Sequence, residues 1–300
     1  MGLIKANQIA KFINLNKFGF VGHFIGWLIL KTLRISKINR IYNRNKHLKG
    51  TQFLDAILDD FKVSFEIPEK DYKRLPKDGG FIVVANHPLG GIDGIILLKI
   101  MLEAREDSKI MANFLLNRIK PLSPYILAVN PFENYKKAFS STNGLKETIK
   151  HLNSGKPIGI FPAGEVSTDK DGEQIIDRPW SSSALKIIQK AEVPIVPMYF
   201  HAKNSKLFYF LSKQSDLLRT AKLPSELLSQ NKRTIKVRIG KSIPVKEQKK
   251  TNNLDEFEKF LRQKIYMLSN PFEKHTKSIS RQTFKLPIKP KQITGPAKQD

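Results

Sequence analysis

Three side chains in this 300-residue sequence, Asn86, His87 and Asp93, form the combination best suited to catalysis. A neutral imidazole can take a proton from an attacking hydroxyl or amine if a carboxylate on its other nitrogen fixes the tautomer and stabilises the imidazolium. His87 and Asp93 are six residues apart, so they do not share one face of a helix, which turns every 3.6 residues. They can meet only if the chain folds back between them, and Gly90 and Gly91 make such folding sterically cheap. The alternative is a histidine that caps a turn and an aspartate whose charge is favoured near a helix N-terminus.

A strand is expected before this pair and a helix after it. Residues 81–85 are apolar and rich in Val and Ile, and Gly79-Gly80 precedes them, which is typical of a buried strand. The apolar run that begins after Asp93 predicts a helix over residues 92–103. A histidine at the end of a parallel strand lies where open α/β sheets usually hold ligands.

Strands and helices are predicted to alternate along the rest of the chain. Apolar runs predict strands at 109–112, 125–129, 157–161, 193–199 and 234–239, and helical spacing of apolar residues predicts helices at 53–61, 145–152, 183–188 and 254–268. A polar loop is expected over residues 168–178. This alternation implies βαβ units, so the predicted fold class is α/β, with a largely parallel central sheet flanked by helices, in a domain covering residues 51–270.

The chain is strongly basic, with 52 Lys and Arg against 27 Asp and Glu and a formal net charge of +25. Such a charge points to anionic partners rather than to the fold, and anionic lipid surfaces, nucleic acid and acidic carrier proteins are the three candidates. The absence of cysteine excludes disulfides and thiolate chemistry.

Residues 1–50 concentrate this charge, since they contain no Asp or Glu and ten Lys and Arg residues. The apolar run Phe18–Leu30 lies among them, and it is shorter than the roughly 20 apolar residues that a spanning helix needs. It also lacks a small-residue cleavage site, which argues against a signal peptide. We predict an amphipathic helical segment in the interface of an anionic membrane; the alternative is a core helix with solvated charges. Residues 271–300 are basic, contain four prolines and are predicted to be disordered.

Three ordered segments carry a resemblance to a known family: Asn86-His87 with Asp93, then Phe161–Ser167, then Val193–Pro197. They resemble the N-H-x4-D, F-P-E-G-T-R-S and V-P-I-x-P motifs of the glycerolipid acyltransferase superfamily, which includes 1-acylglycerol-3-phosphate acyltransferases. The resemblance spans roughly residues 60–245. The forms N-H-P-x-G-G-x-D-G and F-P-A-G-E-V-S, with the later D-R-P-W at 177–180, are more similar to a hemolysin-related bacterial branch that includes acyltransferases for ornithine and glycine lipids.

The resemblance implies that His87 is the general base on an acceptor hydroxyl and that Asp93 orients it. Substrate binding is expected of the neighbouring motif residues: Asn86, Gly90, Gly91, Phe161, Pro162, Gly164, Glu165, Ser167 and Arg178. It also implies a thioester donor, either acyl-carrier protein or acyl-coenzyme A. An acidic carrier protein would be steered by so basic a surface. No bound cofactor and no metal are expected.

Two departures from the superfamily pattern concern the substrate. One more residue separates His87 from Asp93, so the glycine turn must restore the geometry of the pair. In the second motif the glutamate follows the glycine, as Glu165, and the arginine is absent. A cationic group is expected to bind a phosphate-headed acceptor. Either Arg178 replaces that arginine, or the acceptor carries a carboxylate or a zwitterionic amino-acid headgroup.

The expected function is therefore a membrane-associated acyltransferase at the cytoplasmic face of the cell membrane, which acylates a lyso-aminolipid or a lysophospholipid. Ester formation is favoured over amide formation. Two alternatives stay open. A basic nucleic-acid-binding protein would fit the charge, although the sequence has no helix-turn-helix, zinc or aromatic RNA-binding pattern. A non-catalytic membrane-associated scaffold would keep the fold without the chemistry.

Overall fold

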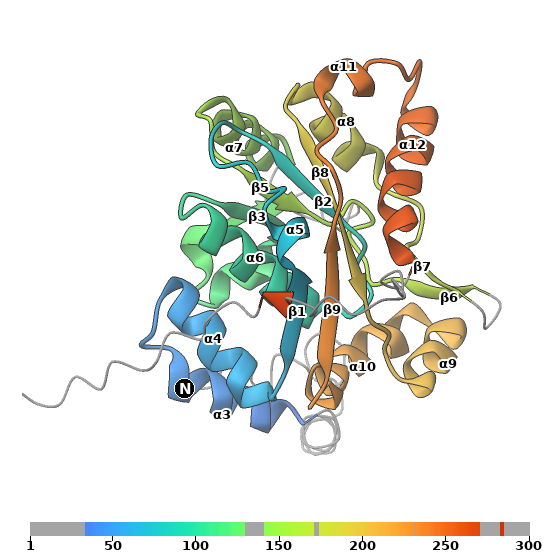
Figure 1. Cartoon of the computed structure of the whole chain (residues 1–300). Coiled ribbons are helices and arrows are strands. Elements are labelled where there is room, and N and C mark those ends of the chain that lie inside the picture. Colours follow the sequence, from blue (N-terminus) through green and yellow to red (C-terminus); the bar gives the residue numbers. More distant parts are fainter. Residues whose placement is uncertain (1–33, 130–140, 171–173, 231, 271–282, 285–300) are drawn as a thin grey trace, which may run out of the picture.

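A computed structural model describes residues 34–129, 141–170, 174–230, 232–270 and 283–284. Its central element is an eight-stranded sheet with the order β10-β1-β9-β8-β2-β5-β3-β4 (Figure 1). The strands are β1 (Ser64–Pro68), β2 (Ile82–Ala85), β3 (Lys109–Asn113), β4 (Ile126–Val129), β5 (Ile158–Ile160), β8 (Ile195–His201), β9 (Thr234–Ile239) and β10 (Thr283–Phe284). Neighbouring strands are parallel except for the pairs β8–β9 and β1–β10. The predicted α/β class with a largely parallel sheet is confirmed.

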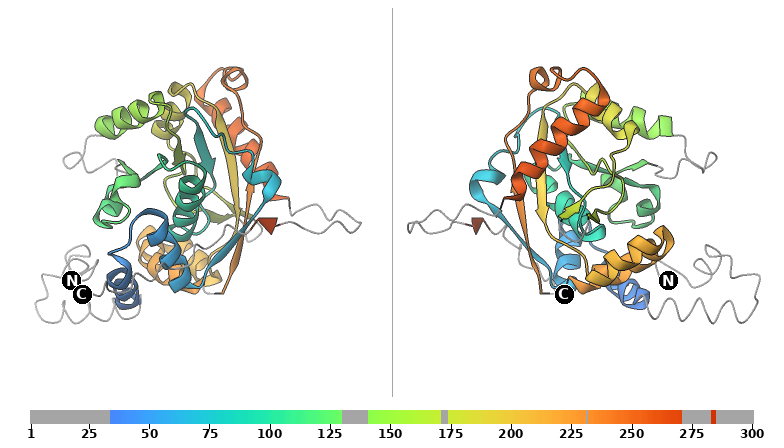
Figure 2. Two further views of the ribbon diagram at one scale, coloured as in Figure 1. Left: turned by 60° about the vertical axis from the view of Figure 1, so that its left-hand side comes forward. Right: turned by 90° about the vertical axis from the view of Figure 1, so that its right-hand side faces the viewer.

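Helices cover both faces of this sheet (Figure 2). They are α3 (Ile35–Asn45), α4 (Gly50–Phe61), α5 (Glu69–Tyr72), α6 (Gly91–Ala104), α7 (Ser141–Asn153), α8 (Ser182–Lys190), α9 (Lys206–Gln214), α10 (Asp216–Ser229), α11 (Val245–Gln248) and α12 (Leu254–Tyr266). Within the described ranges, no helix combines the length and apolarity needed to cross a bilayer.

Strand β2 divides the core into two layers because successive side chains of a strand point to opposite faces. Val83 and Ala85 pack with α4 and α6 on one face, whereas Ile82 and Val84 pack with α8 and α12 on the other. All four side chains are completely buried, which explains why β2 is apolar throughout rather than alternating with polar residues. The strand is thus held rigidly on both sides up to the residue before Asn86.

Two regions differ from the elements expected from the sequence. The predicted polar loop over residues 168–178 contains a small antiparallel sheet of β6 (Thr168–Lys170) and β7 (Gln174–Ile176), so that prediction was wrong there. Helices α9 and α10 were not predicted. They form a packed pair at the C-terminal end of β2, and α10 also contacts α6 (Figure 1).

The basic segment of residues 1–50 is described only in part. Its apolar run lies in residues 1–33, outside the described residues, so the predicted membrane-associated helix remains a prediction. Helix α3 packs against α4, with Ile35, Ile41 and Asn45 buried, and Asn45 donates a hydrogen bond to Asp60 at 2.6 Å. Of the predicted disordered segment 271–300, the structure describes Thr283–Phe284, which pairs with β1.

The turn between β2 and α6 requires glycine at Gly90 and is closely packed at Gly91. Gly90 has φ +85°, a left-handed conformation, and a Cβ there would lie 3.0 Å from Val166 Cγ2. A Cβ at Gly91 would lie 2.8 Å from Leu227 Cδ1 of α10. The turn therefore both bends sharply and packs tightly beneath α10.

This geometry predicts opposite effects for two Gly-to-Ala substitutions only four residues apart. Gly90→Ala should lower the free energy of unfolding by about 1–3 kcal/mol because alanine resists the left-handed conformation. Gly94→Ala should raise it by about 0.5–1 kcal/mol, since a Cβ at Gly94 meets no described atom within 4 Å and alanine favours the helix. Urea unfolding of both variants measures the difference. Equal effects would contradict the requirement for glycine at 90.

Candidate active site

Asp93 lies in the first turn of α6 and its side chain is completely buried. Its Oδ2 accepts hydrogen bonds from the backbone N–H groups of Leu89 at 2.8 Å and Gly90 at 3.2 Å, and its Oδ1 accepts one from Gly94 at 2.9 Å. Three backbone donors at a helix N-terminus favour the negative charge and hold the carboxylate in one orientation.

The glycine turn brings His87 against this carboxylate, with Nδ1 3.1 Å from Asp93 Oδ1. The contact is close, but it does not have the geometry of a full hydrogen bond, as is common for catalytic pairs before substrate binds. The imidazole stacks on Phe161, with ring centroids 4.0 Å apart, and only 16% of the His87 side chain is exposed. Since Nδ1 is turned toward Asp93, Nε2 is the nitrogen on the opposite side of the ring.

Two carboxylates control the charge of this imidazole. Burial lowers the pKa of His87, but the negative charges of Asp93 and Asp177 together raise it by more, so that it stands above the ordinary value of 6.5. The positive charge of Arg219 acts in the opposite direction from the carboxylates. An imidazole with a raised pKa is a stronger base once it is neutral, and the carboxylate of Asp93 is placed where it would stabilise an imidazolium.

Asp177 was not among the predicted site residues, yet its carboxylate holds the backbone of His87 through hydrogen bonds. It is buried, and its Oδ1 accepts hydrogen bonds from the His87 N–H at 3.1 Å and from Ser167 Oγ at 2.6 Å. Ser167 in turn donates its N–H to the His87 carbonyl at 2.8 Å. The D-R-P-W motif was the available signal, although it could not reveal this contact. Ser167, predicted to bind substrate, thus joins Asp177 in clamping His87.

Asn86, Phe161 and Pro162, also predicted to bind substrate, lie around the histidine turn. Asn86 is buried and exchanges two hydrogen bonds with the backbone of Phe200, of 3.1 Å and 2.7 Å, which ties the end of β2 to β8. Phe161 provides the ring beneath His87. Pro162 is buried, and its carbonyl accepts a hydrogen bond from Ser181 at 3.0 Å. Asn86 therefore positions the histidine turn through the backbone of β8.

Gly164 and Glu165 of the second motif, and Arg178 after it, lie at a cluster of charged side chains. Gly164 is exposed, with φ +66°, and it places Glu165 at the protein surface. Glu165 Oε2 lies 3.2 Å from Arg178 Nη1 and 2.7 Å from Arg219 Nη2. Arg219, on α10, was not predicted from the sequence because no motif includes it. In the described residues, no group of three or more His, Cys, Asp or Glu side chains could hold a metal ion.

Comparison with known proteins assigns this site to a family. The sequence profile of a family described as acyltransferase matches residues 9–275, most of the chain. The chain belongs to this acyltransferase family. The expected resemblance and the expected enzyme class are both confirmed.

Characterised relatives of this acyltransferase extend over nearly its whole length. It is similar to a lyso-glycine lipid O-acyltransferase from Bacteroides thetaiotaomicron, with 26% identity over 89% of this chain and 97% of the relative. The same description applies to a relative from Phocaeicola vulgatus, also 26% identical, covering 89% of this chain and 95% of the relative. Among solved structures, a 1-acyl-sn-glycerophosphate acyltransferase from Thermotoga maritima matches with a TM-score of 0.44 and 17% identity, covering 90% of this chain and 97% of that one.

The electrostatics of the pair predict the pH dependence of the acyltransferase. If neutral His87 is the base, kcat/KM should rise with pH through the raised pKa of His87. Asp93→Asn removes the charge that raises this pKa, so the low-pH limb should move to lower pH, while the maximal rate falls roughly 100-fold or more for lack of imidazolium stabilisation. Asp78→Asn, at an exposed aspartate, is the control and should change neither. If the low-pH limb of the pH profile of kcat/KM does not move in Asp93→Asn, Asp93 does not act on the pKa of His87.

Proposed function

We propose that this enzyme transfers a fatty acyl group from a thioester to the hydroxyl of a lysolipid, with His87 as the general base. The observation that carries the proposal is the placement of His87 Nδ1 3.1 Å from a completely buried carboxylate, in a chain of the acyltransferase family. General-base catalysis needs this arrangement, in which one nitrogen is oriented and the other is free.

The chemistry follows from the two nitrogens. Nε2 takes the proton of the acceptor hydroxyl as its oxygen forms a bond to the thioester carbonyl carbon. The carbon–sulfur bond then breaks, and the imidazolium returns the proton to the departing thiolate, giving an ester and a free thiol. Asp93 stabilises the imidazolium between these steps, and the stacked ring of Phe161 limits its rotation.

The names of the relatives support a lysolipid acceptor with an amino-acid headgroup and an ester product. The donor is acyl-carrier protein or acyl-coenzyme A. The net charge of +25 favours the approach of either anionic donor and of an anionic membrane surface.

Membrane association is supported by apolar side chains on the two helices above the histidine turn. Leu207 and Phe210 of α9 and Leu218 of α10 are 53%, 60% and 44% exposed. Lys206 and Lys213 begin and nearly end α9, so apolar and cationic groups lie together, as on interfacial helices. We place the enzyme at the cytoplasmic face of the cell membrane, with this surface and the basic segment of residues 1–50 toward the lipid.

Replacing the base tests the enzyme assignment. In cells lacking the native protein, His87→Ala should fail to restore a diacylated amino-acid lipid, and its lyso precursor should accumulate. With purified protein, kcat should fall by roughly 10²–10⁴-fold. His47→Ala, at an exposed histidine, is the matched control and should behave as wild type. Lipid mass spectrometry and thiol release measure the two effects. Unchanged lipids in the His87→Ala strain would leave the non-catalytic scaffold as the better interpretation.

Vesicle flotation tests the membrane surface. The full chain should bind vesicles containing anionic lipid, and added salt should weaken binding because the lipid charge is screened. Phe210→Ser should weaken binding further, by up to about 10-fold, because an apolar side chain no longer enters the lipid. Leu115→Ser removes an exposed leucine outside α9 and α10 and serves as control. Wild-type binding by Phe210→Ser would exclude α9 from the interface, and no binding to any vesicle would contradict membrane association.

A further inference from the structure

Helix α10 lies directly over the glycine turn that carries His87. A Cβ at Gly90 would lie 3.4 Å from Leu223 Cδ2, and one at Gly91 would lie 2.8 Å from Leu227 Cδ1. Leu223 and Leu227 are four residues apart and therefore share one face of the helix. Arg219 precedes Leu223 by another four residues, so it continues the same face one turn closer to the N-terminus of α10.

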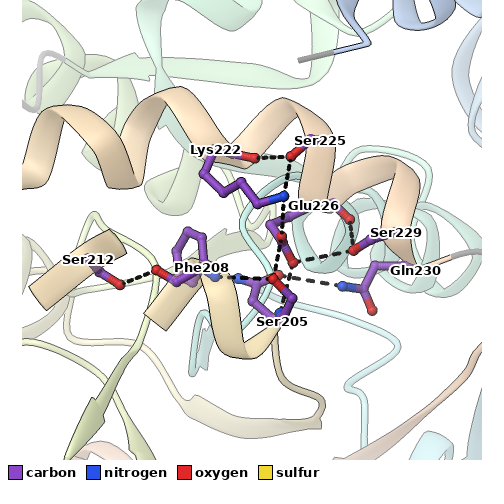
Figure 3. A network of polar contacts seen from close by, with 9 residues as sticks. Ser205, Phe208, Ser212, Lys222, Ser225, Glu226, Ser229 and Gln230 are labelled. Atoms are coloured by element: carbon purple, nitrogen blue, oxygen red, sulfur yellow. Dashed lines mark hydrogen bonds and ion pairs between the residues drawn. The ribbon is translucent and has the colours of Figure 1, made fainter. Parts of the chain in front are cut away.

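A buried polar network fixes α10 in this position (Figure 3). Glu226 is completely buried and accepts hydrogen bonds from the N–H of Ser205 at 2.9 Å and from its Oγ at 2.7 Å. Lys222 Nζ lies 3.2 Å from the same carboxylate. The adjacent Asn204 donates a hydrogen bond to the carbonyl of Pro88, at 3.0 Å, within the histidine turn. Arg219 is thus held in a defined place relative to His87.

The side chain of Arg219 is 93% buried, but its guanidinium is incompletely paired. Nη2 lies 2.7 Å from Glu165 Oε2, and Nη1 lies 3.5 Å from Asp216 Oδ1. Its Nε is buried and has no hydrogen-bond partner in the described part of the chain. An unsatisfied buried donor lowers stability, so stability alone gives no reason for this arrangement. Its charge is also close enough to His87 to act on the imidazole.

Glu165 shows which ligand fits between the two arginines. Its Oε2 is contacted by both Arg219 and Arg178, and such convergence of guanidinium groups is the usual environment of a bound carboxylate. The Glu165 side chain is 49% exposed and follows the open turn at Gly164, so it can rotate into water without losing packing. An external carboxylate can therefore take its place.

We propose that Arg219 and Arg178 bind the carboxylate of the acceptor headgroup in place of Glu165, and so select acceptors with a free carboxylate. This inference rests on the proposed function, since it names the substrate class of the same site. The second motif lacks the arginine of the superfamily pattern, and these two residues supply positive charge in its place. Arg178 comes from the loop between β7 and α8, and Arg219 comes from α10. Arginine suits this role because its planar group binds a carboxylate through two parallel hydrogen bonds.

Three acceptors test the selection with the wild-type enzyme: a lyso-glycine lipid, the same lipid with its carboxylate converted to a methyl ester, and a lysophosphatidate. We expect kcat/KM for the acid to exceed that for the ester by at least about 10-fold, the value of one charge-assisted contact. Equal rates for acid and ester would overturn the headgroup site, as would a preference for the phosphate. This measurement needs no variant, so it does not depend on whether a substitution folds.

Substitutions then assign the preference to the cluster. In Arg219→Gln the ratio of kcat/KM for acid over ester should fall toward 1, and Arg219→Lys should retain part of it. Glu165→Gln removes the competing internal carboxylate and should lower KM for the acid. Lys190→Gln, which removes one exposed cation at the end of α8, away from the cluster and from α9, should keep the wild-type ratio. Equal loss of activity on acid and ester in Arg219→Gln would indicate a structural role and contradict the proposal.

The two levels of the proposal fail in different ways. If the wild-type protein acylates none of the three lysolipids with either donor, the proposed function fails and the headgroup site with it. If it acylates acid and ester equally, and His87→Ala abolishes both reactions, the acyl transfer stands and only the role of Arg219 and Arg178 is excluded.

Discussion

The contact between His87 and Asp93 is possible only because a glycine turn lets a strand end and a helix begin within a few residues. Asp93 lies in the first turn of α6, where three backbone N–H groups satisfy its carboxylate without any other side chain. The Oδ1 of this carboxylate also faces the imidazole, and it lies 3.1 Å from His87 Nδ1. The sharp bend depends on Gly90, because its φ of +85° is one that L-residues avoid.

Distant segments hold this turn in place through its backbone. The carbonyl of His87 accepts a hydrogen bond from the N–H of Ser167, and the N–H of His87 donates one to Asp177. The side chain of Asn86 is hydrogen-bonded to the backbone of Phe200 on β8. These contacts join β2 to the segments that follow β5 and to the neighbouring strand. Several independent hydrogen bonds must therefore break before the backbone that carries the imidazole can move.

Charge has two separate roles in the chain. The net charge of +25 of the whole chain favours encounters with anionic partners, and salt screens this attraction. Around the site the charges are paired instead: Arg178 and Arg219 face Glu165 and Asp216. The exchange proposed above, of the internal carboxylate for an external one, would therefore leave the charge of this cluster unchanged.

The sequence by itself raised the pairing of His87 with Asp93 as one of two alternatives, and it determined the local parts of this protein: the buried strand, the glycine turn and the helix after it. Each depends on neighbours within a few residues, and the apolar runs that alternate with helical patterns were enough to predict a parallel sheet. Only the tertiary structure decided that Asp177 clamps His87 and that Arg219 reaches Glu165, because residues 90 and 54 positions apart meet only after the sheet and α10 are packed. Hydrophobic periodicity carries no information about such contacts, and Pro224, which lies inside α10, is a residue that argues against a helix in the sequence.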